Sequence, residues 1–434
     1  MQNPLLTDLY ELTMAYSYFK RGMNTPAVFD VFVRPPVPYR RFLVFAGLES
    51  VLGFLENLSF GDEEIAYLRG LGLFDEGFLE FLSRLRFTGS VWSMAEGEIA
   101  YPGEPLLTVE APRIEAQLVE TFILNSVNYE TLVASKAARV LLAAGEEASV
   151  VDFSPRRDHG ADAAMKAARS SYLVGFDGTS NTLAGMRYGI PVVGTMAHSY
   201  VMSFPDELTA FRAFAEDHPS PILLIDTYDT MRGLEHAIQV AKELEARGRK
   251  LVGVRIDSGD LAELSRRVRA RLDQAGLPYV RVFVSGDLDE YKIRDFKAAG
   301  GVAWGYGVGT RLGTSYDLPA LGGVYKLVYD TDGPRVKRSP GKVTLPGRKQ
   351  VWRQAGGDLV GLRHEVHPGR RLLKLVMEGG RRLTPPTELA RARAETRSRV
   401  FSLPEEQRVV DRIPRPEYPV RVSRELAALQ RSAS

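Results

Sequence analysis

Four apolar runs recur at nearly even spacing in the middle of the chain, and each ends in a polar or glycine-containing loop. The runs are PILLIDTYDT, KLVGVRIDSGD, VRVFVSGDLDE and VAWGYGVGT. Asp226, Asp257 and Asp287 follow the first three at intervals of 31 and 30 residues, and Thr310 comes 23 residues later. Helical segments separate the runs, an alternation typical of βα units around a parallel sheet. Because parallel strands end at one edge, these loops should converge there.

The same pattern begins earlier, at Ser149. SVVDF is followed by a helical segment at Asp162–Ser171, then by YLVGFDGTSN and, after another helix, by IPVVGTMAHS. About seven strand candidates precede residue 328, which favours an irregular (β/α) barrel over a doubly wound sheet.

Both flanks of this region read as mixed helix and strand. Leu5–Arg21 has helical apolar spacing, Ala27–Val33 alternates like a strand, and Glu388–Arg399 is a charged helix. We therefore expect an α/β protein in three parts: an N-terminal α/β domain (1–112), a barrel-like catalytic domain (113–330), and a basic segment (331–434) that packs with the N-terminal domain into a smaller α/β domain.

Composition excludes several classes of protein. The 434 residues include no cysteine, which excludes disulfides, thiol nucleophiles and cysteine zinc sites. The chain has no uncharged apolar run of about eighteen residues, so we expect no membrane span. The start, MQNPLLTDLYELTMAY, has acids within its apolar run, unlike a signal peptide. These features predict a cytoplasmic protein.

Charge is balanced overall but uneven along the chain. Lys and Arg number 56 against 54 Asp and Glu, yet Arg335–Val400 contains 17 basic and 5 acidic residues. A nucleic-acid surface would interleave aromatic side chains, and the one aromatic residue in this segment is Trp352. We therefore expect no nucleic-acid partner, and interpret the excess as a solvated surface or a rim that attracts phosphorylated substrates.

The loops at the strand ends contain residues suited to phosphate and sugar binding. Glycines in SGD and GYGVGT let backbone N–H groups approach a phosphate, although tight turns alone would also explain them. Carboxylates at strand ends can hold sugar hydroxyls or stabilise a cationic transition state. Their alternative role is helix capping, which we favour for Asp229 but not for Asp257.

Aromatic, basic and histidine residues follow other strands. Phe153 can stack on a flat heterocycle and Arg156 or Arg157 can pair with an anion, or they can be a core phenylalanine and surface arginines. His198 follows IPVV, and a lone histidine is usually structural. No two-histidine metal motif occurs, so we expect no metal site made by protein ligands.

As a set, ten motifs make the chain similar to nicotinate phosphoribosyltransferases. They are TDLYELTMAY, FVRPPVP, FAGLE, EGEIAYPGEPLLTVEAP, DFSPRRDHG, GFDGTSN, GTMAHSYV, VRIDSGDL, VSGDLDEYKI and GYGVGT. The resemblance implies the irregular barrel of type II phosphoribosyltransferases. It also implies transfer of the 5-phosphoribosyl group of phosphoribosyl pyrophosphate to nicotinate, giving nicotinate mononucleotide and pyrophosphate for NAD salvage. Nicotinamide or quinolinate is the alternative acceptor.

The resemblance further implies Mg2+ bound mainly through pyrophosphate or ATP, ligase-type coupling to ATP hydrolysis, and a homodimer with shared active sites. It assigns catalytic roles to His198, Arg255 and Asp257, with His198 also the phosphorylated histidine. It assigns nicotinate binding to Tyr10 (from the partner subunit), Phe153, Arg156, Ser180 and Thr195, with Arg255 also a candidate for the carboxylate. It assigns phosphoribosyl binding to Asp226, Gly286, Asp287, Gly307, Gly309 and Thr310. Nicotinamide-using relatives have an aspartate where this chain has Ser180, which favours the acid over the amide by like-charge repulsion.

Overall fold

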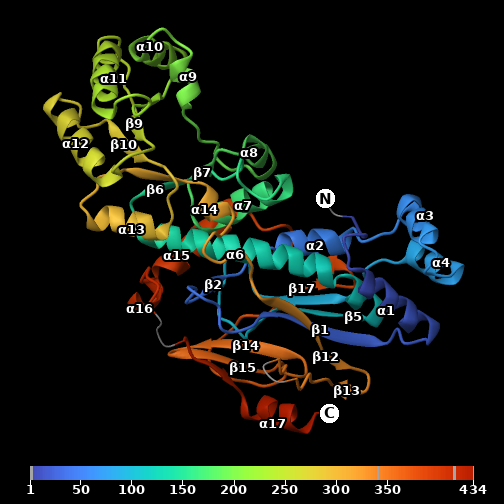
Figure 1. The fold of residues 1–434 in the computed structure, drawn as a ribbon. Coiled ribbons are helices and arrows are strands. Elements are labelled where there is room, and N and C mark those ends of the chain that lie inside the picture. The colour runs from blue at the N-terminus through green and yellow to red at the C-terminus, as the bar shows by residue number, and fades with distance from the viewer. Residues whose placement is uncertain (1–2, 340–341, 414–416, 434) are drawn as a thin grey trace. The chain divides into compact units, whose positions relative to one another are not determined.

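The structure, a computed structural model, describes residues 3–339, 342–413 and 417–433 (Figure 1). The chain folds into two compact units. The first comprises Met1–Ser135, Ala320–Arg399 and Ile413–Ser434, and the second comprises Lys136–Pro319 and Val400–Arg412. N- and C-terminal segments therefore share one α/β unit, as expected from the sequence, while the boundaries 1–112, 113–330 and 331–434 stay a prediction.

The second unit is built on a six-stranded parallel sheet with the order β7-β6-β11-β10-β9-β8. Its strands are β6 (Ser149–Asp152), β7 (Gly178–Thr179), β8 (Ile222–Leu224), β9 (Gly253–Ile256), β10 (Arg281–Val284) and β11 (Gly305–Val308). Its helices are α7 (Ala161–Val174), α8 (Thr182–Tyr188), α9 (His198–Met202), α10 (Glu207–Asp217), α11 (Thr230–Glu245), α12 (Leu261–Gln274), α13 (Glu290–Ala298), α14 (Thr310–Gly313) and α16 (Glu405–Arg408). The curled parallel half-barrel confirms the fold class predicted from the βα alternation.

Aspartates begin four of these helices, including α10, where the carboxylate of Asp206 accepts the Thr209 N–H at 2.8 Å. The carboxylate of Asp229 accepts the Arg232 N–H at 2.8 Å at the start of α11, and Asp260 and Asp289 cap α12 and α13 in the same way. The capping role predicted for Asp229 is confirmed. Asp226 and Asp257 follow strands and do not cap helices, so they remain candidates for ligand binding at the edge where the strands end.

The predicted strand at IPVV is reduced to one parallel bridge between Thr179 and Val192. Pro191 has no N–H to donate to a neighbouring strand, so a regular ladder cannot continue through it. The carbonyl of Pro191 still accepts the Thr179 N–H at 3.0 Å, which holds this segment beside β7.

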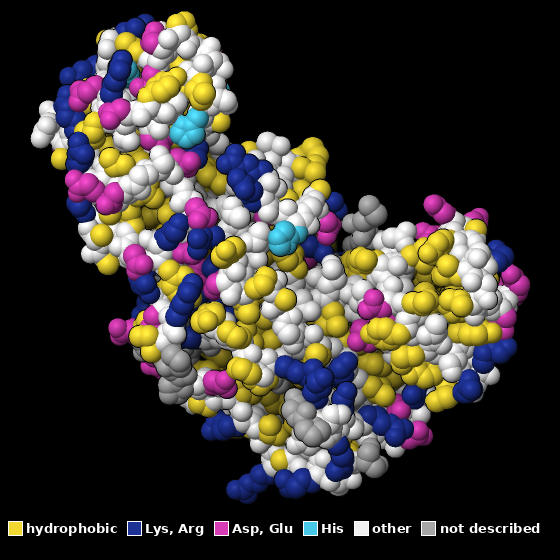
Figure 2. Space-filling model, viewed as in Figure 1, with side chains coloured by type: hydrophobic (Ala, Val, Ile, Leu, Met, Phe, Trp, Pro, Cys, Tyr) yellow, Lys and Arg dark blue, Asp and Glu magenta, His cyan; other side chains and the backbone are white. Residues whose placement is uncertain are grey.

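The outer helices of the second unit have mixed charge. Lys and Arg side chains are interspersed with Asp and Glu on the face seen in Figure 2. Arg271 of α12 pairs with Glu235 of α11 at 2.7 Å, and Arg212 of α10 pairs with Glu243 of α11 at 2.6 Å. Such alternation suits a solvated helical surface.

The first unit joins both ends of the chain in one antiparallel sheet of seven strands, ordered β13-β12-β1-β5-β3-β17-β18. A four-stranded sheet (β16-β14-β15-β19) and a two-stranded sheet (β2-β4) complete its β structure. The strands are β1 (Pro26–Val33), β2 (Leu43–Val44), β3 (Ser90–Ser93), β4 (Ile99–Ala100), β5 (Pro105–Pro112), β12 (Gly323–Asp330), β13 (Gly333–Pro334), β14 (Lys349–Gln354), β15 (Gly357–Leu362), β16 (Arg370–Arg371), β17 (Lys374–Glu378), β18 (Arg381–Arg382) and β19 (Val420–Val422).

The helices of this unit are α1 (Leu9–Lys20), α2 (Leu48–Glu56), α3 (Asp62–Gly70), α4 (Glu76–Arg84), α5 (Arg113–Leu118) and α17 (Arg424–Ser432). Two further helices, α6 (Glu120–Ala144) and α15 (Leu389–Phe401), run across the division between the units. Over the residues that the structure describes, no helix is long and apolar enough to cross a membrane.

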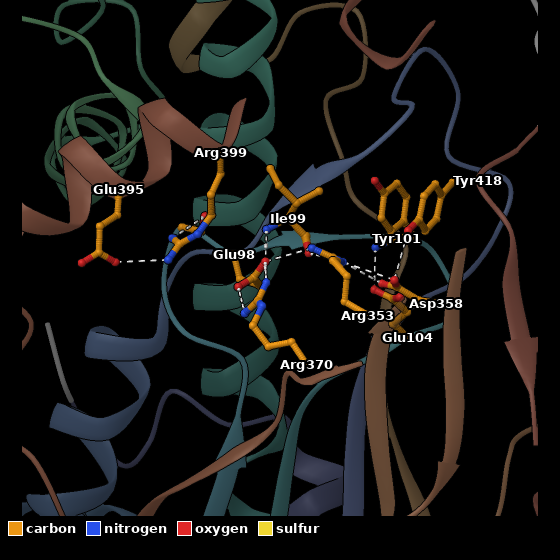
Figure 3. Close-up of polar contacts among 11 residues, drawn as sticks. Glu98, Ile99, Tyr101, Glu104, Arg353, Asp358, Arg370, Glu395, Arg399 and Tyr418 are labelled. Atoms are coloured by element: carbon orange, nitrogen blue, oxygen red, sulfur yellow. Dashed lines mark hydrogen bonds and ion pairs between the residues drawn. The ribbon is translucent and has the colours of Figure 1, made fainter. Parts of the chain in front are cut away.

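Several basic residues of the C-terminal segment pair with acids inside the first unit. Arg353 and Arg370 both pair with buried Glu98, at 2.9 and 2.8 Å (Figure 3). Other C-terminal cations pair with N-terminal acids in the same manner: Lys349 with Asp30, Arg348 and Arg363 with Glu110, and Arg382 with Glu49 and Glu56. Five acids from the N-terminal part of the sequence thus pair with six basic residues of this segment.

One part of this charge cluster is a buried pair of carboxyl groups, Glu104 and Asp358 (Figure 3). Arg353 binds Asp358 at 2.7 Å, and Tyr418, stacked on Tyr101, donates to Asp358 at 3.0 Å. Burial, together with a hydrogen bond to Asp358 and the charge of that residue, raises the pKa of Glu104 well above its usual range. In its protonated form Glu104 can donate a hydrogen bond to Asp358.

Candidate active site

The predicted strand-end edge exists in the second unit and begins with Asp226. This residue follows β8, and its Oδ2 accepts the backbone N–H of Asp257 at 2.9 Å and the hydroxyl of Ser258 at 2.7 Å. Its other oxygen, Oδ1, is buried and has no hydrogen-bond partner among the described residues. One oxygen of Asp226 therefore orders the loop after β9, while the other can accept a hydrogen bond from a ligand or its water.

Arg255 of β9 forms the centre of the site. Its Nε donates to Ser285 Oγ at 2.7 Å, its Nη1 to Thr195 Oγ1 at 3.2 Å and its Nη2 to Asp257 Oδ1 at 2.6 Å. The side chain is 15% exposed, so this arrangement is only weakly screened by solvent. Three loops are thus fixed around one guanidinium. We refer to Arg255, Thr195, Asp257 and Ser285 as the Arg255 clamp.

Asp257 is an anion within this clamp. Burial acts to raise its pKa, but the hydrogen bond from Ser285 and the charge of Arg255 outweigh burial and lower the pKa of Asp257 below its usual value. His198 lies beside it, with Nε2 3.9 Å from Asp257 Oδ2 and Nδ1 3.1 Å from Thr227 Oγ1. The imidazole is held on both sides and is 41% exposed, so part of the ring faces solvent.

Phe153, which follows β6, lies next to the clamp. The guanidinium of Arg255 is 5.4 Å from the centre of its ring, within the range of a cation–π contact. A Cβ atom at Gly307 would lie only 2.5 Å from this ring, so close packing requires glycine there. At Gly286, a Cβ would lie 2.1 Å from the carbonyl of Asp257, and φ is +109°. Packing thus explains both glycines, while phosphate binding by their loops stays a prediction.

Two cations that were not assigned from the sequence, Lys292 of α13 and Arg311 of α14, contact the loop after β10. Asp287 adopts a left-handed φ of 51°, and its Oδ2 is 3.0 Å from Arg311 and 3.2 Å from Lys292. Burial raises the pKa of Asp287, but the hydrogen bonds from Arg311 and Lys292 lower it overall. Arg311 directly follows Thr310 at the start of α14, so its place in the sequence Gly-Thr-Arg could have identified it as a site residue. These cations add positive charge at the predicted phosphoribosyl loops.

The remaining predicted residues differ in their placement. The backbone N–H of Ser180 donates to the carbonyl of Asp152 at 2.8 Å, which places this loop beside the end of β6. Arg156 is exposed on the loop after β6, and Gly309 lies against the carbonyl of Phe153. Tyr10 belongs to α1 in the first unit, where burial and the charge of Glu120 raise the pKa of its hydroxyl. Tyr10 is therefore not one of the residues gathered at the strand ends of the second unit.

Ser285 and Thr227 are further contacts that the sequence analysis did not assign. Both stand next to predicted residues, Ser285 in VSGD and Thr227 in IDTYD. Their position at the ends of predicted strands is the sequence feature that could have identified them. Their partners, Arg255 and His198, come from other βα units, so the pairings become visible only in the fold.

Family models and individual relatives match this chain over most of its length. The N-terminal domain model of nicotinate phosphoribosyltransferase matches residues 5–128, and the nicotinate phosphoribosyltransferase family model matches residues 148–326. A nicotinate phosphoribosyltransferase of Mycobacterium tuberculosis is 49% identical over 427 residues, which cover 96% of this chain and 91% of the relative. The Bacillus subtilis nicotinate phosphoribosyltransferase is 46% identical, covering 80% of this chain and 72% of the relative.

A solved structure agrees with these matches. The crystal structure of human nicotinic acid phosphoribosyltransferase superposes with a TM-score of 0.86 at 31% identity, covering 99% of this chain and all of the human chain (100%). A nicotinate-nucleotide pyrophosphorylase from Pyrococcus furiosus shares the fold, with a TM-score of 0.76 at 24% identity and coverage of 93% and 97%. From these matches and the strand-end site, we conclude that the chain belongs to the nicotinate phosphoribosyltransferase family.

Proposed function

We propose that this chain transfers the 5-phosphoribosyl group of phosphoribosyl pyrophosphate to nicotinate, and that it serves NAD salvage. The pyridine nitrogen supplies the electron pair of the new N–C1′ bond, and pyrophosphate leaves with the electrons of the C1′–O bond. The main support is the Arg255 clamp, which holds a cation and the Asp257 carboxylate in fixed positions at the strand ends. Carboxylates so placed would stabilise the positive charge that develops on the ribose ring.

Base recognition would use the loops around Phe153. Its ring would stack on the pyridine, and Arg255, with Arg156 and Thr195, would face the nicotinate carboxylate. The hydroxyl of Ser180 can donate a hydrogen bond to an anion and carries no charge that would repel it. This residue set supports nicotinate over nicotinamide as the acceptor.

Phosphoribosyl pyrophosphate would lie along the loops after β8 to β11. Gly286, Gly307 and Gly309 keep the backbone open, Asp287 orders its loop, and the Thr310 hydroxyl adds a donor. Arg311 would contribute positive charge next to these loops.

The residues at Asp226 fit a hydrated Mg2+ that arrives with the pyrophosphate. The support is the buried, unpartnered Oδ1 of Asp226, a hard oxygen of the kind that Mg2+ and its waters prefer. Asp226 and Asp257 would hold the ion together with substrate oxygens. When bound, Mg2+ neutralises charge on the leaving pyrophosphate.

Coupling to ATP would act through phosphorylation of His198. A neutral imidazole nitrogen can accept the γ-phosphoryl group of ATP, with ADP as the leaving group. The contact of Nδ1 with Thr227 and the exposure of the ring support access of a nucleotide to this histidine. A phosphohistidine beside the substrate loops would add about two negative charges and order Mg2+ and nearby cations.

We further propose a cytoplasmic homodimer in which Tyr10 of the partner subunit covers the second face of the pyridine. The support is the family resemblance together with the 46% exposure of Tyr10, which leaves an aromatic face available to another molecule. Mixing Tyr10→Ala chains with Asp257→Asn chains would test this, because a mixed dimer with shared sites has one intact site. Recovery of activity in mixed dimers is expected, and no recovery would contradict shared sites.

A product assay tests the transferase activity directly. Purified protein is incubated with phosphoribosyl pyrophosphate and Mg2+ and with nicotinate, nicotinamide or quinolinate, and the mononucleotides are separated by chromatography. We expect nicotinate mononucleotide and pyrophosphate in equal amounts, with nicotinate strongly preferred. Comparable turnover of nicotinamide or quinolinate would refute the assignment of the base.

The phosphohistidine is tested with γ-labelled ATP and a matched histidine. His236 of α11 also contacts a neighbouring side chain through Nδ1, Glu207 at 2.9 Å, but lies away from the strand ends. We expect acid-labile label on wild type and His236→Ala and none on His198→Ala, which should retain a weaker, ATP-independent synthesis. Equal labelling of all three proteins, or full ATP stimulation of His198→Ala, would remove His198 from the mechanism.

A further inference from the structure

A fully buried carboxylate links the two loops that flank the end of β6. Asp152, the last residue of β6, accepts the backbone N–H of Ser154 and the hydroxyl of Thr179, both at 2.8 Å. Thr179 in turn accepts the backbone N–H of Asn181 at 3.0 Å. Asp152 and Thr179 are both 0% exposed. The Asp152 side chain therefore ties the loop after β6 to the loop after β7.

A second carboxylate extends this link toward α14. The hydroxyl of Ser154 donates to Asp158 Oδ2 at 3.0 Å, and Arg157 N–H closes the same turn on the carbonyl of Ser154 at 2.7 Å. A Cβ atom at Gly313 would lie 1.7 Å from Asp158 Oδ1, so the loop packs against the backbone of α14. The chain from Asn181 through Asp152 to Asp158 thus crosses three neighbouring segments.

Stability alone does not account for this arrangement. Burial raises the pKa of Asp152, and burial with the charge of Asp152 raises the pKa of Asp158 to about 6. The hydrogen-bond donors on Asp152 are neutral groups, and His159 is the one titratable group that acts to lower the pKa of Asp158. Two cations of neighbouring helices have acidic partners of their own: Lys166 of α7 pairs with Asp162, and Arg311 of α14 pairs with Asp287 and Asp289.

Two carboxyl groups held by neutral donors are costly to bury, and an apolar cluster of the same volume would be cheaper. What the carboxylate provides is a fixed geometry, because its two oxygens accept from two different loops at once.

We propose that Asp152 and Thr179 are positioning residues for base recognition, which set the distance between the loop carrying Phe153 and Arg156 and the loop carrying Ser180. The inference rests on the proposed function, in which both loops contact the pyridine ring. Neither residue has to touch the substrate. Loss of the link should let the two loops drift apart and weaken nicotinate binding, with little change in the binding of phosphoribosyl pyrophosphate.

The kinetic test removes the Thr179 hydroxyl without changing side-chain volume. Thr179→Val leaves Asp152 Oδ2 and the Asn181 N–H without partners, and should raise KM for nicotinate about five- to tenfold, with KM for phosphoribosyl pyrophosphate within about twofold. Thr179→Ser keeps the hydroxyl and should restore KM to within about twofold of wild type. Asp152→Asn cannot accept from both donors and should resemble Thr179→Val.

Thr131 offers a matched control in the other unit. It is 0% exposed, and its hydroxyl bonds to the backbone N–H and carbonyl of Ala46 at 3.2 and 3.1 Å. Thr131→Val should lower the melting temperature as Thr179→Val does but leave KM for nicotinate unchanged. An equal rise in both variants, or no rise in Thr179→Val and Asp152→Asn, would overturn the proposal. If Thr179→Val fails to fold, Asp152→Asn decides by the same criterion.

Hydrogen exchange provides a readout that does not depend on activity. In Thr179→Val, peptides covering residues 152–160 and 178–182 should both lose protection, whereas Thr131→Val should change neither. Unchanged exchange in Thr179→Val would overturn the link even if wild type makes nicotinate mononucleotide. If wild type makes none, the proposed function fails and so does the assignment to base recognition. The exchange result then tells whether the structural link itself stands.

Discussion

Replacing Arg255 by lysine tests the Arg255 clamp without changing its charge. Arginine reaches Ser285, Thr195 and Asp257 simultaneously because its guanidinium presents donors in a rigid fork. A lysine ammonium is a point charge on a flexible stem and can retain the pair with Asp257. It would then release Ser285 and Thr195, and with them the loops after β10 and before α9.

The size of the effect follows from these contacts. Hydrogen bonds to a charged group contribute about 1.5–3 kcal/mol each, and two of the three would be lost. Arg255 is 15% exposed, so solvent can replace them only in part. Allowing for relaxation, we expect a loss of about 2–4 kcal/mol of transition-state stabilisation, which corresponds to roughly 30- to 1000-fold in kcat/KM.

The assay is formation of nicotinate mononucleotide with phosphoribosyl pyrophosphate at saturation, compared with Arg269→Lys. Arg269 of α12 is 21% exposed and donates to the carbonyls of Val280 and Leu277 at 2.6 and 3.1 Å, so it is similarly bonded but remote from the strand ends. We expect the control to lower stability while kcat/KM stays within about twofold. If Arg255→Lys also kept kcat/KM within about threefold, the clamp could not be the centre of catalysis.

Four further outcomes are expected. Ser180→Asp should raise KM for nicotinate about tenfold through like-charge repulsion and favour nicotinamide, and steady-state kinetics showing unchanged preference would contradict this. Thr310→Val should weaken phosphoribosyl pyrophosphate binding by about 1–3 kcal/mol, and calorimetry showing unchanged affinity would count against its role. The fold raises the pKa of Asp158 to about 6. Protonated Asp158 therefore contributes its full stability below the pKa that this group has in the unfolded chain, and that contribution is lost as pH rises through 6. The free energy of unfolding of Asp158→Asn should therefore rise by about 1–3 kcal/mol relative to wild type between pH 4 and pH 7. The same pH dependence of this free energy in both proteins would disprove the prediction. The pKa of Glu104 is also raised, so wild type should lose stability as pH rises from the unfolded pKa of this carboxyl group through its raised folded pKa. Glu104→Gln, which is neutral at every pH, should lose less stability over that range, and denaturant unfolding with identical pH slopes for both proteins would contradict this.

The parallel sheet and its functional edge could be predicted because they depend on local alternation. A buried strand followed by a loop and an amphipathic helix is written in consecutive residues, and three such units placed Asp226, Asp257 and Asp287 at strand ends. The same logic failed at IPVV, where Pro191 interrupts the ladder and one bridge remains. A pattern of apolar residues predicts a strand from the hydrophobic run alone, and it takes no account of the N–H that proline lacks.

The fate of the basic C-terminal segment could not be predicted in this way. Arg353 and Arg370 pair with Glu98 across 255 and 272 residues of sequence. A charge count over one segment includes only one member of each of these ion pairs, and it therefore predicts a basic surface. The tertiary fold brings acids of the first 110 residues to this segment, because the first unit is built from both ends of the chain.

The Arg255 clamp shows where the limit lies for the site itself. The partners of Arg255 stand 60, 30 and 2 residues away in Thr195, Ser285 and Asp257. The βα alternation predicts that all of these loops share an edge, yet it cannot say which side chains meet, because that depends on strand order. The order β11-β10-β9-β8 makes β10 the direct neighbour of β9, and therefore Ser285, rather than a residue of β11, is the one that Arg255 reaches. Strand order is thus the piece of information that turns a predicted edge into a set of defined contacts.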